Sequence, residues 1–276
     1  MVVKTLARRA LDGVGVYQRL RASRVYDLYW RTVDRRIVEK RDCDVRHYRE
    51  WLEGLDSGGL IFDIGANHGA KTDVFLRLGA RVIAVEPDPM NQLILRQQFI
   101  DWRLTPRPVT IVGQAVSNVN TVGTMWIDKP GSAKNTLSPK WVETLRKDTN
   151  RFGHSLAFRS QTTVTTTTLD DLIATYGPPF FIKIDVEGLE VAVLRGLHQV
   201  VPYLSFEVNL PEFRSEGLEC IDILAGITDT GRFNYVVDGA QHTAGTSWLT
   251  AALFSDWLTR CDESNIEVLW KSGASR

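Results

Sequence analysis

Residues 60–69 read Leu-Ile-Phe-Asp-Ile-Gly-Ala-Asn-His-Gly, and this stretch decides the fold. An apolar run ends at Asp63, turns through Gly65 and Gly69, and continues into a helix-like segment over 70–78. Many α/β proteins hold a nucleotide-like cofactor where a buried strand stops at such a glycine turn and a helix begins. Glycine permits the tight turn, and the first N–H groups of the helix have no intrahelical partners. We therefore expect a cofactor site at this turn.

Short β-rich runs alternate with helix-length segments along the rest of the chain. The predicted strands are 60–64, 81–86, 109–117, 121–128, 161–169, 180–185, 203–208, 233–238 and 248–254, and the predicted helices are 70–78, 89–100, 188–197 and 211–228. This alternation predicts parallel βαβ units in a doubly wound α/β sheet with helices on both faces. Only a short turn separates 109–117 from 121–128, so we expect these two strands to pair antiparallel.

The composition is that of a soluble globular protein, with 276 residues, 43% hydrophobic residues and a formal net charge of zero. The three cysteines, Cys43, Cys220 and Cys261, show neither metal-binding spacing nor a disulfide framework. We interpret them as reduced thiols of a cytoplasmic protein. No run of about 20 apolar residues predicts a transmembrane helix.

Two regions lie outside the alternating pattern. Residues 1–57 are predicted to be a helical extension, and their first 50 residues carry thirteen Lys/Arg against seven Asp/Glu. Peripheral contact with an anionic membrane is the alternative role for these basic helices, although Gly13 and Gly15 interrupt the pattern. Residues 129–160 form a basic insertion, interpreted either as a solvated lobe or as a substrate lid that favours an anionic acceptor.

The glycine turn lacks features of phosphate-binding motifs. It reads Gly-x-x-x-Gly without the additional glycine of the dinucleotide fingerprint, and no Lys-Ser/Thr pair follows, which excludes a P-loop. S-adenosylmethionine, which has no phosphate and carries a sulfonium and an ammonium, suits such a turn beside acidic residues. Glu86 ends the second strand, where a carboxylate can accept hydrogen bonds from ribose hydroxyls.

A second acidic block, Lys183-Ile-Asp-Val-Glu-Gly188, ends a strand that is predicted to be central. Ligands bind at the carboxyl ends of the strands in open α/β sheets, so Asp185 and Glu187 are candidate site residues. Glu207 has the same position on the next strand. Asp185, Glu207 and Asn209 could also offer oxygen ligands to Mg²⁺, although no metal-binding spacing supports such a site.

Four stretches resemble the signature of FkbM-type methyltransferases: Phe62-Asp-Ile-Gly-Ala-Asn-His-Gly69, Val85-Glu-Pro-Asp88, Thr168-Leu-Asp-Asp171 and Lys183-Ile-Asp-Val-Glu-Gly-Leu-Glu190. The resemblance covers about residues 58–255 and implies a methyltransferase domain over 58–276, with a class I, Rossmann-like seven-stranded fold and S-adenosylmethionine as methyl donor. It also implies O-methylation of a sugar, glycolipid or polyketide-like natural product.

The resemblance also assigns roles to residues of this chain. The implied cofactor-binding residues are Asp63, Gly65, Asn67, Gly69, Glu86, Ser117, Asn118 and Asp185, with Glu86 on the ribose and Ser117 or Asn118 at the adenine. Asp185 and Glu187 would lie near the sulfonium and the acceptor. The substrate is expected to be a small molecule or glycan.

A hydroxyl acceptor needs a general base, because it is a poor nucleophile at neutral pH. The candidates are Asp185, Glu187, Glu207 and the loop histidine His242, and strand-end position favours the first two. The rival interpretations are an NAD-dependent oxidoreductase and a non-catalytic cofactor-binding module. No Asn/Asp-Pro-Pro-Tyr/Phe motif indicates a nucleic-acid base as acceptor.

Overall fold

A seven-stranded sheet forms the centre of the molecule, which we describe from a computed structural model covering residues 35–101, 109–147, 156–237 and 247–273. In spatial order the strands are β3 (Val109–Val112), β2 (Arg81–Val85), β1 (Leu60–Ile64), β7 (Phe181–Ile184), β8 (Tyr203–Asn209), β10 (Asn265–Lys271) and β9 (Arg232–Val237). Strand β10 is antiparallel to both of its neighbours, and the other adjacent strands are parallel. The predicted fold class, a mostly parallel α/β sheet of seven strands, is confirmed.

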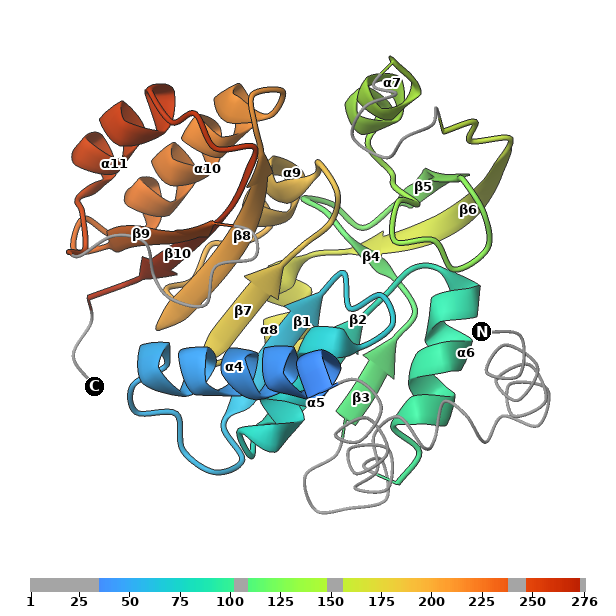
Figure 1. Cartoon of the computed structure of the whole chain (residues 1–276), viewed down its shortest axis with the longest axis horizontal. Helices are drawn as coiled ribbons and strands as arrows, with labels where there is room; N and C mark the ends of the chain where they lie inside the picture. Colours follow the sequence, from blue (N-terminus) through green and yellow to red (C-terminus); the bar gives the residue numbers. More distant parts are fainter. Residues whose placement is uncertain (1–34, 102–108, 148–155, 238–246, 274–276) are drawn as a thin grey trace.

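Helices cover both faces of this sheet (Figure 1). They are α4 (Arg35–Trp51), α5 (Ala70–Arg77), α6 (Pro89–Gln98), α8 (Leu169–Tyr176), α9 (Glu190–Leu194), α10 (Arg214–Ile227) and α11 (Ala251–Thr259). Helix α7 (Pro139–Lys147) lies apart from this sheet, at the top of Figure 1. Side-chain caps fix where several of them begin. The Asp88 carboxylate accepts a hydrogen bond from Met90 N–H at the start of α6, and Thr168 does the same for Asp171 N–H at α8.

Side chains of β1 alternate between the two faces of the sheet, as the period of two requires. Leu60, Phe62 and Ile64 belong to the larger core cluster, together with buried residues of α8 to α11. Ile61 packs in a second cluster with residues of α4, α5 and α6. Asp63 therefore lies on the face covered by α4 and α5.

Helix α4 is anchored to the second cluster by aromatic contacts. The Tyr48 ring meets Phe75 edge-to-face at 5.1 Å between centroids, and the Trp51 ring meets Phe181 in the same way at 4.9 Å. These contacts hold α4 across the sheet beside α5 (Figure 1). The predicted basic helical extension spans residues 1–57. Its first 34 residues lie outside the described residues.

A small second sheet corrects one predicted pairing. The predicted strand 109–117 is two strands, β3 and β4 (Ala115–Val116), and β4 leaves the main sheet to pair in parallel with β6 (Ser160–Thr167). Strand β5 (Val122–Ile127) pairs antiparallel with β6, not with its predecessor. The Thr166 hydroxyl, which donates to Val119 O and accepts from Thr121 N–H, ties the turn between β4 and β5 to strand β6.

The prediction was also wrong near the C-terminus. Residues 248–254 do not form a strand, because Thr250 caps a helix, α11, that begins at Ala251. Only Leu249 pairs with a strand, through an isolated bridge to Phe233. The antiparallel strand β10 was not predicted from the sequence. Over the described residues, no helix is long and apolar enough to cross a membrane.

Candidate active site

The turn after β1 is held by tight backbone packing. Gly65 and Ala66 both donate backbone hydrogen bonds to Val85 O, at 2.9 and 3.0 Å. Gly65 has φ of 82°, and a Cβ at this position would lie 1.8 Å from the carbonyl oxygen of Asp185. A side chain is therefore excluded here both by conformation and by the neighbouring strand end.

Glu86 joins this turn to the end of β2. Its Oε2 accepts a hydrogen bond from Asn67 N–H and its Oε1 accepts one from Asp88 N–H, both at 2.8 Å. The residue is only 5% exposed. Burial raises the pKa of Glu86 to about 7, and the two backbone N–H donors oppose that rise.

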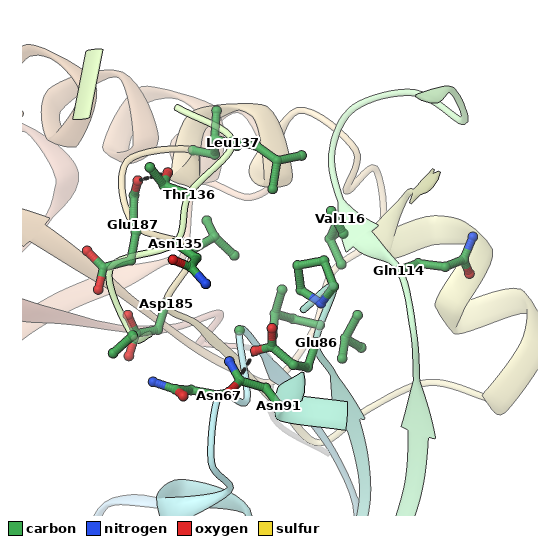
Figure 2. Close-up of a pocket in the computed structure, with 18 of the residues that line it drawn as sticks. Asn67, Glu86, Asn91, Gln114, Val116, Asn135, Thr136, Leu137, Asp185 and Glu187 are labelled. Atoms are coloured by element: carbon green, nitrogen blue, oxygen red, sulfur yellow. Dashed lines mark hydrogen bonds between the residues drawn. The ribbon is translucent and has the colours of Figure 1, made fainter. Parts of the chain in front are cut away.

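A cavity of about 290 Å³ lies at the carboxyl ends of β1, β2 and β7 (Figure 2). Six of the residues predicted for the site line it: Gly65, Asn67, Glu86, Asp185, Glu187 and Glu207. Figure 2 shows Glu86, Asn67 and Asn91 grouped together at one part of the wall and Asp185 and Glu187 at another. Glu86 and the acidic block that contains Asp185 and Glu187 thus meet in one cavity.

Four other predicted residues lie elsewhere. Asp63 is buried under α5, where Thr72 Oγ1 donates to its Oδ2 at 2.5 Å. Gly69 packs against Leu95 and Phe99, since a Cβ there would lie 2.5 Å from the Phe99 ring. Ser117 and Asn118 follow β4 and are absent from the lining of the cavity. His242 lies outside the described residues.

Several lining residues were missed. Gln114, Ala115 and Val116 line the cavity in place of Ser117 and Asn118. The sequence signal was Gly113, which ends β3 two residues before β4 begins. If the predicted strand had ended at Val112 instead of Ser117, the residues that follow it, Gln114 to Val116, would have been predicted to line the site.

The loop before α7 covers the cavity. Its residues Ser132, Ala133, Asn135, Thr136 and Leu137 line the wall. Asn135 Nδ2 donates to Asp88 Oδ2 at 2.7 Å, and Thr136 Oγ1 donates to Glu187 O at 2.8 Å. This loop belongs to the predicted insertion 129–160, which therefore begins as a cover over the site.

The basic side chains of that insertion point to other partners. Lys140 bonds Glu216 on α10 and lies over the Phe213 ring, 4.5 Å from its centroid. Lys147 pairs with Glu143 at 2.6 Å. None of the insertion's Lys or Arg residues within the described ranges lines the cavity. The residues by which this loop lines the cavity are uncharged.

The family of the chain follows from a comparison with protein-family models. Residues 63–234 match the model described as the methyltransferase FkbM domain. The chain belongs to the FkbM methyltransferase family. This match contains both acidic blocks and the glycine turn, and the family implies S-adenosylmethionine as methyl donor.

Other similarities of this FkbM-family methyltransferase are partial or distant. A stretch of 51 residues is 39% identical to ribosomal RNA small subunit methyltransferase A of Chlamydia caviae, and it spans 18% of each protein. A precorrin-6y C5,15-methyltransferase structure from Geobacter metallireducens GS-15 is 11% identical, with a TM-score of 0.40 and coverage of 86% of this chain and 88% of that one. The plantazolicin methyltransferase BpumL in complex with SAH is 8% identical, with a TM-score of 0.42 and coverage of 98% and 99%.

The methyltransferase's cavity is acidic. Its described lining contains Glu86, Asp185, Glu187 and Glu207 but no Lys, Arg or His. Asn67 Oδ1 and Asn91 Oδ1 are buried acceptors without a hydrogen-bond partner among the described residues. Such a wall fits a ligand with positive charge and N–H or O–H donors, as S-adenosylmethionine has.

Three carboxyl groups at the ends of β7 and β8, those of Asp185, Glu187 and Glu207, differ in pKa. Burial opposes ionisation of Asp185, but the Lys183 ammonium, 2.7 Å away, and a hydrogen bond from Glu207 hold the pKa of Asp185 below its ordinary value. Burial and the Asp185 charge raise the pKa of Glu187 to about 8 and that of Glu207 well above its ordinary range. Asp185 is thus the most acidic of the three carboxyl groups, and Glu187 and Glu207 bind protons more tightly than free carboxyl groups do.

The Mg²⁺ site considered for Asp185, Glu207 and Asn209 finds no support. Asn265 Nδ2 donates to Glu207 Oε1 and reaches Asn209 Oδ1 at 3.5 Å, so an amide donor occupies the space between two of the expected ligand oxygens. Within the described ranges, no group of three or more His, Cys, Asp or Glu side chains is placed to hold a metal ion.

Proposed function

We propose that this FkbM-family methyltransferase methylates a hydroxyl oxygen of a small-molecule or glycan acceptor: a sugar, a glycolipid or a polyketide-like compound. The observation that carries the proposal is the grouping of three carboxyl groups of different acidity, Asp185, Glu187 and Glu207, in a cavity that also contains Glu86. Glu86, Gly65 and Asn67 would hold the donor.

A hydroxyl acceptor explains why several carboxyl groups of different pKa gather here. When bound, S-adenosylmethionine supplies a methyl group on a sulfonium: the oxygen–carbon bond forms, the sulfur–carbon bond breaks with its electron pair left on sulfur, and the hydroxyl proton must leave. A base is most effective when its pKa lies near the working pH. Glu187, whose pKa is raised to about 8, meets this requirement better than Asp185.

Asp185 then has the supporting role. Its charge raises the pKa of Glu187, and its position beside Lys183 keeps that charge in place. Holding the acceptor and the donor in line is itself a large part of catalysis of a displacement reaction. The lid loop, through the bond of Thr136 to Glu187 O, keeps the base at the cavity wall.

The proposal is tested first by calorimetry. S-adenosylmethionine or its demethylated product should bind the wild-type protein, whereas NAD should not, and the reverse result would overturn the assignment of the cavity. The second test follows transfer of a radiolabelled methyl group to a panel of hexosides, glycolipids and polyketide alcohols, with an oligoribonucleotide and a matched amine series as controls. Methylation of the amines alone would contradict O-methylation, and methylation of the oligoribonucleotide alone would contradict a small-molecule or glycan acceptor.

Variants separate binding from chemistry. Glu187→Gln should bind the donor and lose at least about 100-fold in turnover, the scale of losing a general base. Asp185→Asn keeps the shape of the side chain and removes its charge, so it should lower turnover less than Glu187→Gln does. Equal turnover of Glu187→Gln and wild type would exclude Glu187 as the base.

A further inference from the structure

A second cavity, of about 580 Å³, lies on the face of the sheet that α4 covers. It adjoins the 290 Å³ cavity proposed to hold the methyl donor, which we call the donor cavity. Residues of α4, the start of α5 and the strands β7 to β10 line the second cavity. Asp185 and Glu207 line both cavities. The two spaces therefore meet at Asp185 and Glu207, next to Glu187, the proposed base, which lines the first cavity only.

Polar side chains occupy this face where apolar ones would be expected under a helix. Ile61 and Phe181 are buried near the amino ends of their strands, but Lys183, Ser205 and Glu267 follow toward the cavity on the same face. Burying polar groups beneath α4 costs free energy unless they are paired or serve a ligand. The polar wall and the cavity thus occur together.

Carboxyl groups outnumber lysines in this wall by five to three, and most of the charged groups are paired or hydrogen-bonded. Lys71 pairs with Asp44 at 2.9 Å, and Lys183 pairs with Asp185. Glu267 accepts hydrogen bonds from Tyr48 at 3.0 Å and Ser205 at 2.7 Å. Two further charged residues of the lining, Glu39 and Lys40, are exposed residues of opposite sign. An anionic ligand would have to compete with carboxylates for Lys71 and Lys183, whereas hydroxyl groups can join the existing bonds as donors and acceptors.

His47 on α4 adds a group without a protein partner. It lines the cavity, and its buried Nε2 has no hydrogen-bond partner among the described residues. The ring is fixed by packing, stacked on Trp51 at 6.4 Å and edge-on to Tyr48 at 5.4 Å between centroids. Burial lowers the pKa of His47, which favours the neutral ring at pH 7. A neutral imidazole nitrogen can pair with a hydroxyl.

We propose that this second cavity is the acceptor compartment, that it takes a neutral polyhydroxylated ligand such as a glycosyl unit, and that His47 hydrogen-bonds an acceptor hydroxyl there. The proposal rests on the proposed methyl-transfer function, since it presents the acceptor to Asp185 and Glu207 where the two cavities meet. It replaces the anionic acceptor predicted from the basic insertion with a neutral one.

The test uses saturation-transfer NMR in the presence of S-adenosylhomocysteine. The probes are a panel of methyl pyranosides and the 6-phosphates of the same sugars. Wild-type protein should bind at least one neutral glycoside more tightly than its phosphate. Binding of no glycoside, or tighter binding of the phosphates, would overturn the proposal.

Two variants locate the binding. Ala70 is an exposed residue of α5 that lines the cavity, so Ala70→Trp should fill it and weaken glycoside binding at least tenfold. Ala252→Trp, at an exposed position of α11 away from both cavities, is the matched control and should bind like wild type. Glycoside binding by Ala70→Trp at wild-type strength would place the acceptor elsewhere.

His47→Phe tests the hydrogen bond itself, because it keeps the stacked ring and removes both nitrogens. Glycoside binding should weaken about fivefold to tenfold, the scale of one hydrogen bond, with an unchanged melting temperature. Calorimetry with S-adenosylhomocysteine on each variant separates the two proposals. If the wild-type protein fails to bind it, the methyl-transfer function fails. If the cofactor binds while glycoside binding ignores Ala70→Trp and His47→Phe, only the acceptor compartment fails.

Discussion

The donor cavity and the α4-side cavity share two carboxyl groups but are built in different ways. The donor wall comes largely from short stretches of sequence, such as the turn at Gly65 and the strand end at Glu86. The other wall gathers residues from Glu39 to Glu267. Backbone geometry determines the wall of the donor cavity, and the packing of α4 determines the wall of the α4-side cavity. Changes at the donor turn should therefore be more damaging than changes under α4.

Gly65→Ala should have the largest effect. The new Cβ would lie 1.8 Å from Asp185 O in a backbone with φ of 82°, so the turn and the end of β7 must separate. We expect loss of donor binding and a decrease in the free energy of unfolding of about 3 kcal/mol or more, in the range of strongly destabilising mutations. Urea unfolding and calorimetry measure the two effects.

Gly58→Ala is the control for this prediction. Gly58 also has a positive φ, 91°, but a Cβ there would have no atom within 4 Å. It should show only the conformational cost, about 1 kcal/mol, and bind the donor normally. If both variants unfold alike, conformation rather than the approach to Asp185 sets the cost at Gly65.

Glu86→Ala comes next in size. The change leaves the N–H groups of Asn67 and Asp88 without their carboxylate and removes the group assigned to the ribose. Donor affinity should fall about tenfold to 100-fold, because a hydrogen bond to a charged group contributes about 1.5 to 3 kcal/mol. Titration calorimetry measures the affinity, and circular dichroism checks that the protein remains folded. Unchanged affinity would remove Glu86 from the donor site.

The acidic wall predicts that donor binding depends on pH. With pKa values of about 7 and 8, Glu86 and Glu187 bind protons in the free protein near neutral pH. A cationic ligand favours their ionised forms, so binding should release protons and tighten as the pH rises from 6 to 8. We expect an increase of about fivefold to tenfold for S-adenosylmethionine.

Two comparisons sharpen this pH effect. S-adenosylhomocysteine lacks the sulfonium charge and should show a smaller increase over the same range. Glu187→Gln removes one of the two titrating groups and should also flatten the profile. Identical profiles for both ligands and both proteins would show that the raised pKa values of the wall do not act on the donor.

The sequence predicted part of the cavity wall at the ends of β1, β2 and β7, because local chemistry determines these positions. Glycine at a positive φ and an acid at a strand end are visible in the order of residues, and both occur at the predicted positions. The α4-side cavity could not be predicted, because His47, Lys71 and Glu267 meet only after α4 crosses the sheet and β10 inserts antiparallel between β8 and β9. Neither event leaves a local signal: β10 follows a helix that resembled a strand in its apolar composition.

Substitution of Asp63 should have the smallest effect on donor affinity. It also tests whether a local sequence pattern can mislead a prediction of site residues. Like Glu86, Asp63 is an acid near the end of a strand, but its side chain turns to the α4 face, where Thr72 and the charge of Lys183 surround it. Glu86 lines the donor cavity and Asp63 does not. Asp63→Asn should therefore leave donor affinity within about twofold of wild type and lower the free energy of unfolding by about 1 to 2 kcal/mol, the cost of weakening one buried charge-assisted hydrogen bond. A tenfold loss of donor affinity with unchanged stability would mean that Asp63 acts on the donor after all. Position at a strand end would then be a better predictor of a donor-binding residue than the face of the sheet on which its side chain lies.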